Sequence, residues 1–336
     1  MTTARDAALL ARLSTEQADS EFSDLDRLPV PELVTLLTEQ ARRAGDAVAA
    51  SSHLLAPVVE AVVRSMEAGG RLIYVGAGTA GRIGMLDAAE AAPTFSVPDG
   101  TIAGVMAGGA EAFGAALENV EDDPAAGAEA LDRLGVGPRD AVIGISASGR
   151  TPYVLGAVQR ANELGAVTAG LACNKSTPLG ALAQYPMEIW VGPEVIAGST
   201  RLNSGTVQKI VLNTISTATM VRLGKTYGSL MVDVRPTNTK LRERAVRIVT
   251  TIAGVRSSEA RSALVASDWR PKVASIVASC GIDPEAATAL LERHGGRLRD
   301  ALDAARAEPP LAKASPPPEP RSPLAPVSRD TPRRTA

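Results

Sequence analysis

The sequence predicts an α/β fold in which helices cover both faces of a parallel sheet, followed by a small C-terminal helical domain. Short, continuously apolar runs alternate with segments of helical periodicity through the middle of the chain, as in sheets that are buried on both faces. This alternation stops near residue 240, and three short helical patterns then follow one another between Ser257 and Ala305. A chain of 336 residues is long enough for two such domains.

The expected elements follow one another along the chain. A loosely patterned N-terminal arm leads into a helical stretch from Pro31 to Glu67, and Gly69-Gly70 ends it as glycine commonly ends a helix. Five apolar runs predict strands, and the segments between them predict helices: strands at 72–75, 102–106, 141–145, 167–171 and 189–191, and helices at 81–91, 110–121, 152–164 and 204–222. Beyond Glu308, nine prolines in the last 28 residues predict a disordered tail.

Composition narrows the classes of function. The 35 basic and 37 acidic residues leave a net charge of −2, and aromatic residues make up 3%, which argues against a nucleic-acid groove. Two cysteines (Cys173, Cys280) and two histidines (His53, His294) are too few for a disulfide framework or a thiolate zinc site. No apolar run reaches the length of a membrane span, and the first residues lack the pattern of a signal peptide. We therefore expect a cytoplasmic protein without a metal, a cofactor or a membrane partner.

A glycine-rich turn follows the first predicted strand. Residues 76–81 match G-x-G-x-x-G, a pattern that brings backbone amides and a helix N-terminus to a phosphate. A dinucleotide site also needs an acidic residue at the end of the next strand. The strand at 102–106 instead ends in Ala107-Gly108-Gly109. The turn therefore predicts an anion site and argues against a nicotinamide cofactor.

Two further polar turns stand at predicted strand-to-helix junctions. Residues 146–152, SASGRTP, place two serine hydroxyls, a threonine and a guanidinium where a helix begins, which suits a single phosphate. An ordinary capped turn remains the alternative for this segment taken alone. Residues 198–201, GSTR, precede the next long helix and have the same character. Because parallel strands end at one edge of their sheet, the three turns together predict a site for a phosphorylated small molecule.

Two glutamates are candidates for proton transfer. Glu90 shares a helix face with Ile83, Leu86 and Asp87, so we expect it to be partly buried. Glu121 stands at the edge of the apolar stripe of the helix predicted at 110–121. A pair of carboxyl groups can act as acid and base if their environments separate their proton affinities. Spacing alone favours an ordinary charge at the flank of a helix for both.

Five longer segments carry a family resemblance: RLIYVGAGTAGRIGMLDAAEAAPTF at 71–95, ENVEDD at 118–123, GISASGRTPYV at 144–154, GPEVIAGSTRLNSGTVQKIVLNTISTATM at 192–220 and LGKTYGSLMVDVRPTNTKLRERAVRIV at 223–249. These segments resemble the N-acetylmuramic acid 6-phosphate etherases. The helical segment 257–305 is similar to the C-terminal domain of that family.

The resemblance implies a sugar isomerase (SIS) fold, a Rossmann-like parallel-sheet sandwich, in a homodimer with shared active sites. It implies a lyase of amino-sugar metabolism and peptidoglycan recycling that cleaves the lactyl ether of N-acetylmuramic acid 6-phosphate. The products would be N-acetylglucosamine 6-phosphate and D-lactate. Glu121 matches the base that removes the C2 proton of the open-chain sugar, and Glu90 matches the acid that protonates the departing lactate. No metal or nucleotide is implied.

The resemblance also implies which residues bind the phosphate and how the chain divides. The phosphate contacts would come from Ser148, Arg150 and Thr151, with Thr79 and Ser199 as helpers. The expected division is an N-terminal helical arm at 1–57, a SIS domain at 58–245, a small UBA-like helical domain at 246–306 and a disordered Pro-rich tail at 307–336.

The chain departs from the family pattern at several positions. Ala80 stands where serine is usual, Asn203 replaces a lysine, Ala91-Ala92 replaces Cys-Pro, and TEQAD at 15–19 is missing the usual Arg-Asn of the arm. Two alternatives stay open: a non-catalytic sugar-phosphate-binding regulator related to the vertebrate glucokinase regulatory protein, and an aldose–ketose isomerase on the same fold. Retention of both candidate glutamates favours the etherase.

Overall fold

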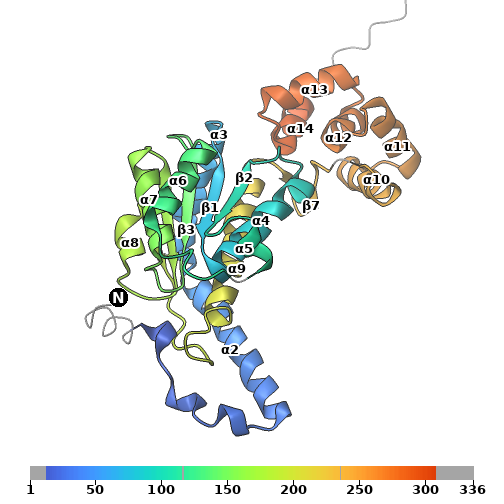
Figure 1. Cartoon of the computed structure of the whole chain (residues 1–336). Helices are drawn as coiled ribbons and strands as arrows, with labels where there is room; N and C mark the ends of the chain where they lie inside the picture. Colours follow the sequence, from blue (N-terminus) through green and yellow to red (C-terminus); the bar gives the residue numbers. More distant parts are fainter. Residues whose placement is uncertain (1–12, 116, 235, 308–336) are drawn as a thin grey trace, which may run out of the picture.

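The centre of the chain forms a five-stranded parallel sheet in the computed structural model, which describes residues 13–115, 117–234 and 236–307 (Figure 1). Its strands are β1 (Leu72–Gly76), β2 (Ile102–Met106), β3 (Ala141–Ile145), β4 (Val167–Ala172) and β5 (Tyr185–Glu188), in the order β2-β1-β3-β4-β5. Every residue of β1 and β3 is buried, which is why these strands read as continuous apolar runs.

Helices cover both faces of this sheet. One face packs against α3 (Ser52–Glu67), α4 (Gly78–Phe95) and α9 (Asn203–Arg222), and the other against α6 (Pro124–Leu134), α7 (Pro152–Glu163) and α8 (Pro178–Leu182). Leu72 and Tyr74 of β1 point into the first hydrophobic cluster, whereas Ile73 and Val75 point into the second. Because side chains alternate along the buried strand, β1 contributes residues to the hydrophobic cores on both faces of the sheet. The predicted parallel-sheet sandwich is confirmed.

The fifth predicted strand is wrong in position. It was expected at 189–191, but β5 spans Tyr185–Glu188 and pairs only with β4 at the edge of the sheet. Pro186 is tolerated there because an edge strand has one side without ladder partners. Ile189 follows the strand, is fully buried and donates its N–H to the carbonyl of Ala172 at 2.8 Å. Its burial explains the apolar run that suggested a strand.

The helix expected at 110–121 is also wrong. Only α5 (Glu111–Gly114) forms there, and the chain then continues through turns in which Asn119 adopts a left-handed φ of 62°. Just after that segment the chain begins α6, a helix that is not among the predicted elements. Asp123 caps it by accepting hydrogen bonds from the N–H groups of Ala125 and Ala126, and Pro124 occupies the first helical turn.

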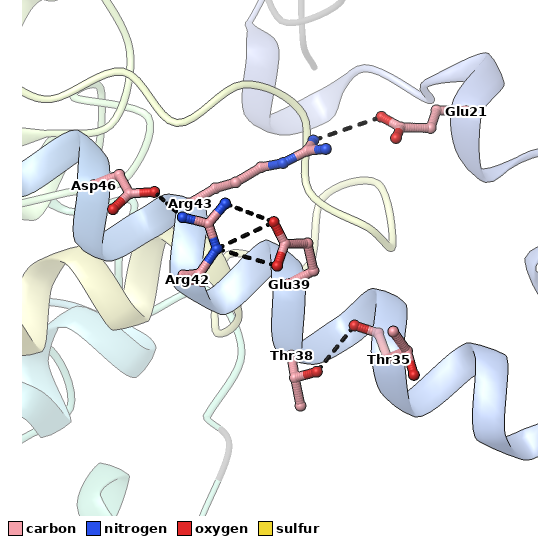
Figure 2. Close-up of polar contacts among 7 residues, drawn as sticks. All are labelled: Glu21, Thr35, Thr38, Glu39, Arg42, Arg43 and Asp46. Carbon is pink, nitrogen blue, oxygen red and sulfur yellow. Dashed lines mark hydrogen bonds and ion pairs between the residues drawn. The ribbon is translucent and has the colours of Figure 1, made fainter.

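The N-terminal arm and α2 (Val30–Ala50) project from the α/β body (Figure 1). Short 3₁₀ turns, η1 (Ser14–Glu16), η2 (Ser20–Phe22) and η3 (Leu25–Arg27), precede α2, whose second half buries Ala44 and Val48. Figure 2 shows Arg42 of α2 between Glu39 and Asp46, and Arg43 reaching Glu21 of the arm at 3.8 Å. These pairs are exposed, so each contributes at most about 1 kcal/mol.

A helical bundle follows the α/β body (Figure 1). The hairpin of β6 (Thr226–Tyr227) and β7 (Leu230–Met231) leads into α10 (Thr239–Ala253), α11 (Ser257–Ala266), α12 (Pro271–Cys280), α13 (Pro284–Arg293) and α14 (Leu298–Ala307).

The four-part division of the chain into domains stays a proposal, and its boundaries at 57/58 and 245/246 fall inside α3 and α10. The Pro-rich segment 308–336 lies outside the described residues.

Within the described residues no single helix is long and apolar enough to cross a membrane. Helices α2 and α3 reach that length and hydropathy only when taken together, and they are bent by 63° where they meet.

We predict that Asp123→Ala lowers the free energy of unfolding by about 1 kcal/mol, because the first amides of α6 lose their acceptor. Urea denaturation followed by circular dichroism measures this change. Asp122→Ala is the matched control, since Asp122 is exposed and adjacent; it is expected to stay within about 0.5 kcal/mol of the parent chain. Equal loss in both variants would contradict the capping role.

Candidate functional site

The turn after β3 gathers hydroxyl groups at the start of α7. Ser146 Oγ lies 2.8 Å from Thr151 Oγ1 and accepts a hydrogen bond from the N–H of Gly149 at 3.0 Å. Ser148 Oγ accepts from the N–H of Arg150 at 3.2 Å and lies 3.3 Å from Ser146 Oγ. Ser146, which was not predicted as a site residue, is therefore the buried centre that organises the turn.

The same turn requires glycine at position 149, and it leaves a side-chain N–H of Arg150 without a hydrogen-bond partner among the described residues. Gly149 has a φ of 68°, and a Cβ at this position would lie 2.4 Å from Cβ of Thr177. Among the described residues, Arg150 Nε is buried without a hydrogen-bond partner. Thr151, the residue that caps α7, makes no side-chain hydrogen bond to the helix amides. An arginine with an unused donor beside a cluster of hydroxyl groups at the start of a helix is suited to an anion.

The turn after β1 brings α4 against the sheet and beside α9. A Cβ on Gly76 would lie 2.6 Å from the backbone N of Gly81, so only glycine permits this approach. Thr79 is partly buried in the first turn of α4. Its Cγ2 lies 3.4 Å from where a Cβ of Gly205 would stand in the first turn of α9. The first and third predicted turns are therefore neighbours.

The third segment is held by a buried carboxylate that the sequence reading missed. Glu194 is almost fully buried and caps α9: it accepts hydrogen bonds from the N–H of Asn203 at 2.8 Å and of Ser204 at 2.9 Å. The hydroxyl of Ser204 also donates to it at 2.7 Å. Ser199 lies partly exposed in the loop between this acid and the helix. Glu194 stands nine residues before the first residue of α9, so no local capping pattern in the sequence identifies it.

Asn174 links the second and third segments through the N-terminal arm, and it too was missed. Its Oδ1 accepts from the N–H and the hydroxyl of Ser14 at 2.9 Å each, and its Nδ2 donates to the carbonyl of Ala147 at 3.0 Å. Thr15 completes the link, because its carbonyl accepts from the N–H of Gly198 at 2.8 Å. The arm thus stabilises the floor of the candidate site.

Glu121 lies in an exposed turn and not on the expected helix. Its carbonyl accepts a hydrogen bond from the N–H of Tyr153, in the first turn of α7, at 3.0 Å. Arg82 of α4 holds the preceding residues, since its guanidinium donates to the carbonyls of Ala112, Phe113 and Ala115 at 2.8–3.0 Å. The segment that carries Glu121 is therefore fastened to the helices that follow the first and second turns.

Glu90 is exposed in the structure, so the prediction that it is partly buried is wrong. The buried stripe of α4 runs through Ala80, Gly84, Asp87 and Ala91, and Glu90 lies just outside it. The predicted face was displaced because Leu86, which helped to define it, is 44% exposed.

Asp87 is the buried carboxylate of α4. It accepts hydrogen bonds from the hydroxyls of Tyr74 at 2.8 Å and Ser216 at 3.2 Å, and from the side-chain amide of Asn213. Burial and the nearby carboxylate raise the pKa of Tyr74 well above its usual value. These contacts join α4 to β1 and α9, which gives Asp87 a structural role.

The site therefore combines a polar cradle with one exposed carboxylate, Glu121, on a segment bonded to the start of α7. Glu90 lies about three turns along α4 from Thr79, so this chain alone does not bring it to the cradle. Three turns converge at the carboxyl ends of the strands, and the described part of the chain contains no group of three His, Cys, Asp or Glu side chains suited to a metal ion. Such an arrangement can bind a phosphate, and Glu121 can offer one acid or base group near it.

Comparison with known proteins identifies the family. A family model described as "Glucokinase regulatory protein N-terminal SIS domain" matches residues 54–162. The chain is 52% identical to an N-acetylmuramic acid 6-phosphate etherase of Rubrobacter xylanophilus over 88% of its own length and 98% of that protein. The chain belongs to the N-acetylmuramic acid 6-phosphate etherase family. The etherase of Cutibacterium acnes is 48% identical, with 86% of this chain and 95% of that protein covered.

The resemblance read from the sequence is thus confirmed, and the SIS match falls on the first half of the α/β body. Among solved structures, a phosphoheptose isomerase from Francisella tularensis is similar with a TM-score of 0.43 at 17% identity; 58% of this chain and 100% of that chain are covered. The etherases match nearly the whole chain, whereas the SIS domain model matches only part of it.

We predict that Arg82→Met increases amide hydrogen exchange of residues 111–121 by about 10- to 100-fold, because three carbonyl groups lose a charged donor. Mass spectrometry of the corresponding peptides measures the exchange. Arg133→Met is the control, since Arg133 pairs only with exposed Glu129 among the described residues. Unchanged exchange in Arg82→Met would show that other contacts hold the segment.

Proposed function

We propose that this chain cleaves the D-lactyl ether of N-acetylmuramic acid 6-phosphate to N-acetylglucosamine 6-phosphate and D-lactate. The observation that carries this proposal is the 52% identity to a protein of that name over nearly the full length of both chains. The cradle of hydroxyls and backbone amides around Ser146 supports a phosphorylated substrate. Peptidoglycan recycling is the process to which such a reaction belongs.

In this proposal the second turn binds the phosphate. Ser148 and Thr151 supply hydroxyls at the start of α7, and Arg150 supplies the positive charge. Thr79 and Ser199 contribute from the two neighbouring turns. Support comes from the unused donor on Arg150 and from the hydroxyls of Ser148 and Thr151 at the start of α7, which can donate to phosphate oxygens.

The proposed reaction is an elimination followed by hydration. The open-chain aldehyde acidifies the proton on C2, and Glu121 removes it. The C3–O bond then breaks, and Glu90 donates a proton to the departing lactate. Water adds to the resulting double bond of the unsaturated aldehyde, so that its hydroxyl is bonded to C3 and a proton returns to C2. The net change is ether plus water to alcohol plus D-lactate.

We further propose a homodimer whose subunits complete each other's sites. Large apolar side chains are exposed next to both glutamates: Leu86 at 44%, Phe113 at 47% and Leu117 at 40%. A partner that covers them would also desolvate the carboxyl groups, and unequal desolvation of the two would separate their proton affinities. Analytical ultracentrifugation that finds only monomer at assay concentration would contradict this. The two unpaired cysteines are consistent with action in the cytoplasm, which cell fractionation tests.

A sugar-phosphate-binding regulator is the second candidate function, because residues 54–162 match the SIS domain of the glucokinase regulatory protein. Incubation with N-acetylmuramic acid 6-phosphate distinguishes the two, with D-lactate measured enzymatically. Tight binding of the sugar phosphate without release of D-lactate would favour the regulator.

We predict that Glu121→Gln lowers kcat by about 10²- to 10⁴-fold with little change in substrate binding, because the base is lost while the phosphate cradle remains. Single-turnover release of D-lactate measures this. Glu118→Gln, an exposed change on the same segment, is expected to retain activity. If Glu121→Gln released D-lactate at the parent rate, the assignment of the base would be wrong.

We predict that Arg150→Gln raises the dissociation constant for the sugar phosphate by about 10- to 100-fold, since a charged hydrogen bond contributes roughly 1.5–3 kcal/mol. Isothermal titration calorimetry measures the constant. Arg160→Gln in α7, the helix that follows this turn, removes a cation that pairs with Asp132 and Glu163, and it should leave binding unchanged. A similar loss in both variants would point to a general effect of charge.

A further inference from the structure

A second cavity lies between the α/β body and the C-terminal helices, with a volume of about 720 Å³. Ser96, which follows α4, comes from the body. The segment after β7, which packs into the hydrophobic cluster of the bundle, lines the cavity together with α10, the α11–α12 turn, the start of α12 and part of α13. Among its described lining residues there is neither of the candidate glutamates and no member of the phosphate turns. Its size is typical of small-molecule sites.

Positive charge predominates in this cavity. Four basic side chains and three acidic ones line it: Lys225, Arg242, Arg270 and Lys272, against Asp233, Asp268 and Glu292. Two of the cations share one carboxylate oxygen, since Lys272 Nζ lies 2.8 Å and Lys225 Nζ 3.1 Å from Oδ2 of Asp233. One carboxylate between two ammonium groups leaves a net positive charge at that point.

Lys272 is the more deeply buried of the two lysines. Its side chain is 8% exposed, and its second partner is the carbonyl of Gly296 at 2.8 Å. Burial lowers the pKa of Lys272, and the carboxylate of Asp233 opposes that shift. Because Lys272 shares its carboxylate with Lys225, a further anion near this ammonium group would be attracted by the charge left uncompensated there.

The start of α12 adds donors to the same wall. The helix has ten residues, begins at Pro271, and its N-cap Arg270 makes no side-chain hydrogen bond to the helix amides. Its N-terminus therefore presents free amides and the positive end of the helix dipole next to Lys272. Arg270 is held nearby through a hydrogen bond to Thr288 Oγ1 at 3.2 Å.

An aromatic ring completes the lining. Asp268 and Trp269 are consecutive non-glycine residues with left-handed φ values of 50° and 54°, which is an unfavourable backbone conformation. The turn is fixed by the N–H of Trp269, which donates to the carbonyl of Leu264 at 2.7 Å. The guanidinium of Arg242 lies 5.1 Å from the centre of the Trp269 ring. The strained turn thus holds an indole ring in a basic wall.

We propose that this cavity binds a small phosphorylated molecule, with the phosphate near Lys272, Lys225 and the start of α12 and the remainder against Trp269. Two lysines that share a single carboxylate, a helix start without a side-chain cap and a half-buried ring supply contacts for both parts of such a ligand. This site is separate from the proposed etherase site and does not depend on that activity. Phosphate is favoured over a carboxylate because its oxygens can engage both lysines and the helix amides at once.

Tryptophan fluorescence of the full chain tests the proposal. The chain has two tryptophans, so Trp190→Phe leaves Trp269 as the only reporter. Inorganic phosphate is titrated at constant ionic strength, and a parallel titration with acetate tests whether a carboxylate binds equally well. We expect a saturable change in Trp269 fluorescence with phosphate. When Lys272→Met is combined with Trp190→Phe, the phosphate concentration at the midpoint should be at least about tenfold higher, because a charged contact is lost.

Further variants separate binding here from other effects. Lys225→Gln, at a less buried position, should raise the midpoint in the same direction and covers the case in which Lys272→Met does not fold. Arg306→Gln, a cation of the bundle outside the cavity, and Arg150→Gln, in the phosphate turn, should leave the midpoint unchanged. A linear, unsaturable response, equal midpoints for acetate and phosphate, an unchanged midpoint in Lys225→Gln, or loss of the signal in Arg150→Gln would each overturn the proposal.

Discussion

The candidate site depends on how closely two helices approach the ends of two neighbouring strands. At the end of β1, the backbone of Gly76 touches that of Gly81, and at the end of β3, Gly149 fits against Thr177 in a left-handed conformation. A side chain at Gly76 would push α4 away from the sheet, and one at Gly149 would collide with Thr177 at the start of α8. Because β1 and β3 are adjacent and parallel, both helix N-termini lie at the same edge of the sheet. The remaining contacts of the site refine this arrangement.

Many of these remaining contacts join a side chain to backbone groups. Arg82 holds the segment before Glu121 through three carbonyls, Asn174 joins the arm to the second turn, and Glu194 binds the amides that start α9. Buried polar side chains are stable when their hydrogen-bonding capacity is used. Each of these residues meets that condition by binding a loop, and each loop carries a residue proposed to touch substrate.

The departures from the family pattern gain a structural context. Ala80 is buried in the hydrophobic cluster beneath the first turn, so the hydroxyl missing here would have stood at a packed position. Asn203 is also buried, and its backbone N–H binds Glu194. Both differences therefore alter the layer below the phosphate turns, whereas Ser148, Arg150 and Thr151 are unchanged.

The sequence by itself determined the buried strands, the long helices α4, α7 and α9, the polar turns before them and the family, whereas it missed α6 and α8 and expected three helices where α11 to α14 form. These features depend on residues that are close together in the chain: continuous apolar runs, glycines at fixed spacing and long matching segments. Only the tertiary structure decided which carboxylate of α4 is buried, because the choice between Asp87 and Glu90 depends on where β1 and α9 pack. The same holds for the edge position of β5, for the link from Asn174 to an arm 160 residues away and for the basic cavity under α12. Contacts of this kind join residues far apart in sequence, and no local pattern records them.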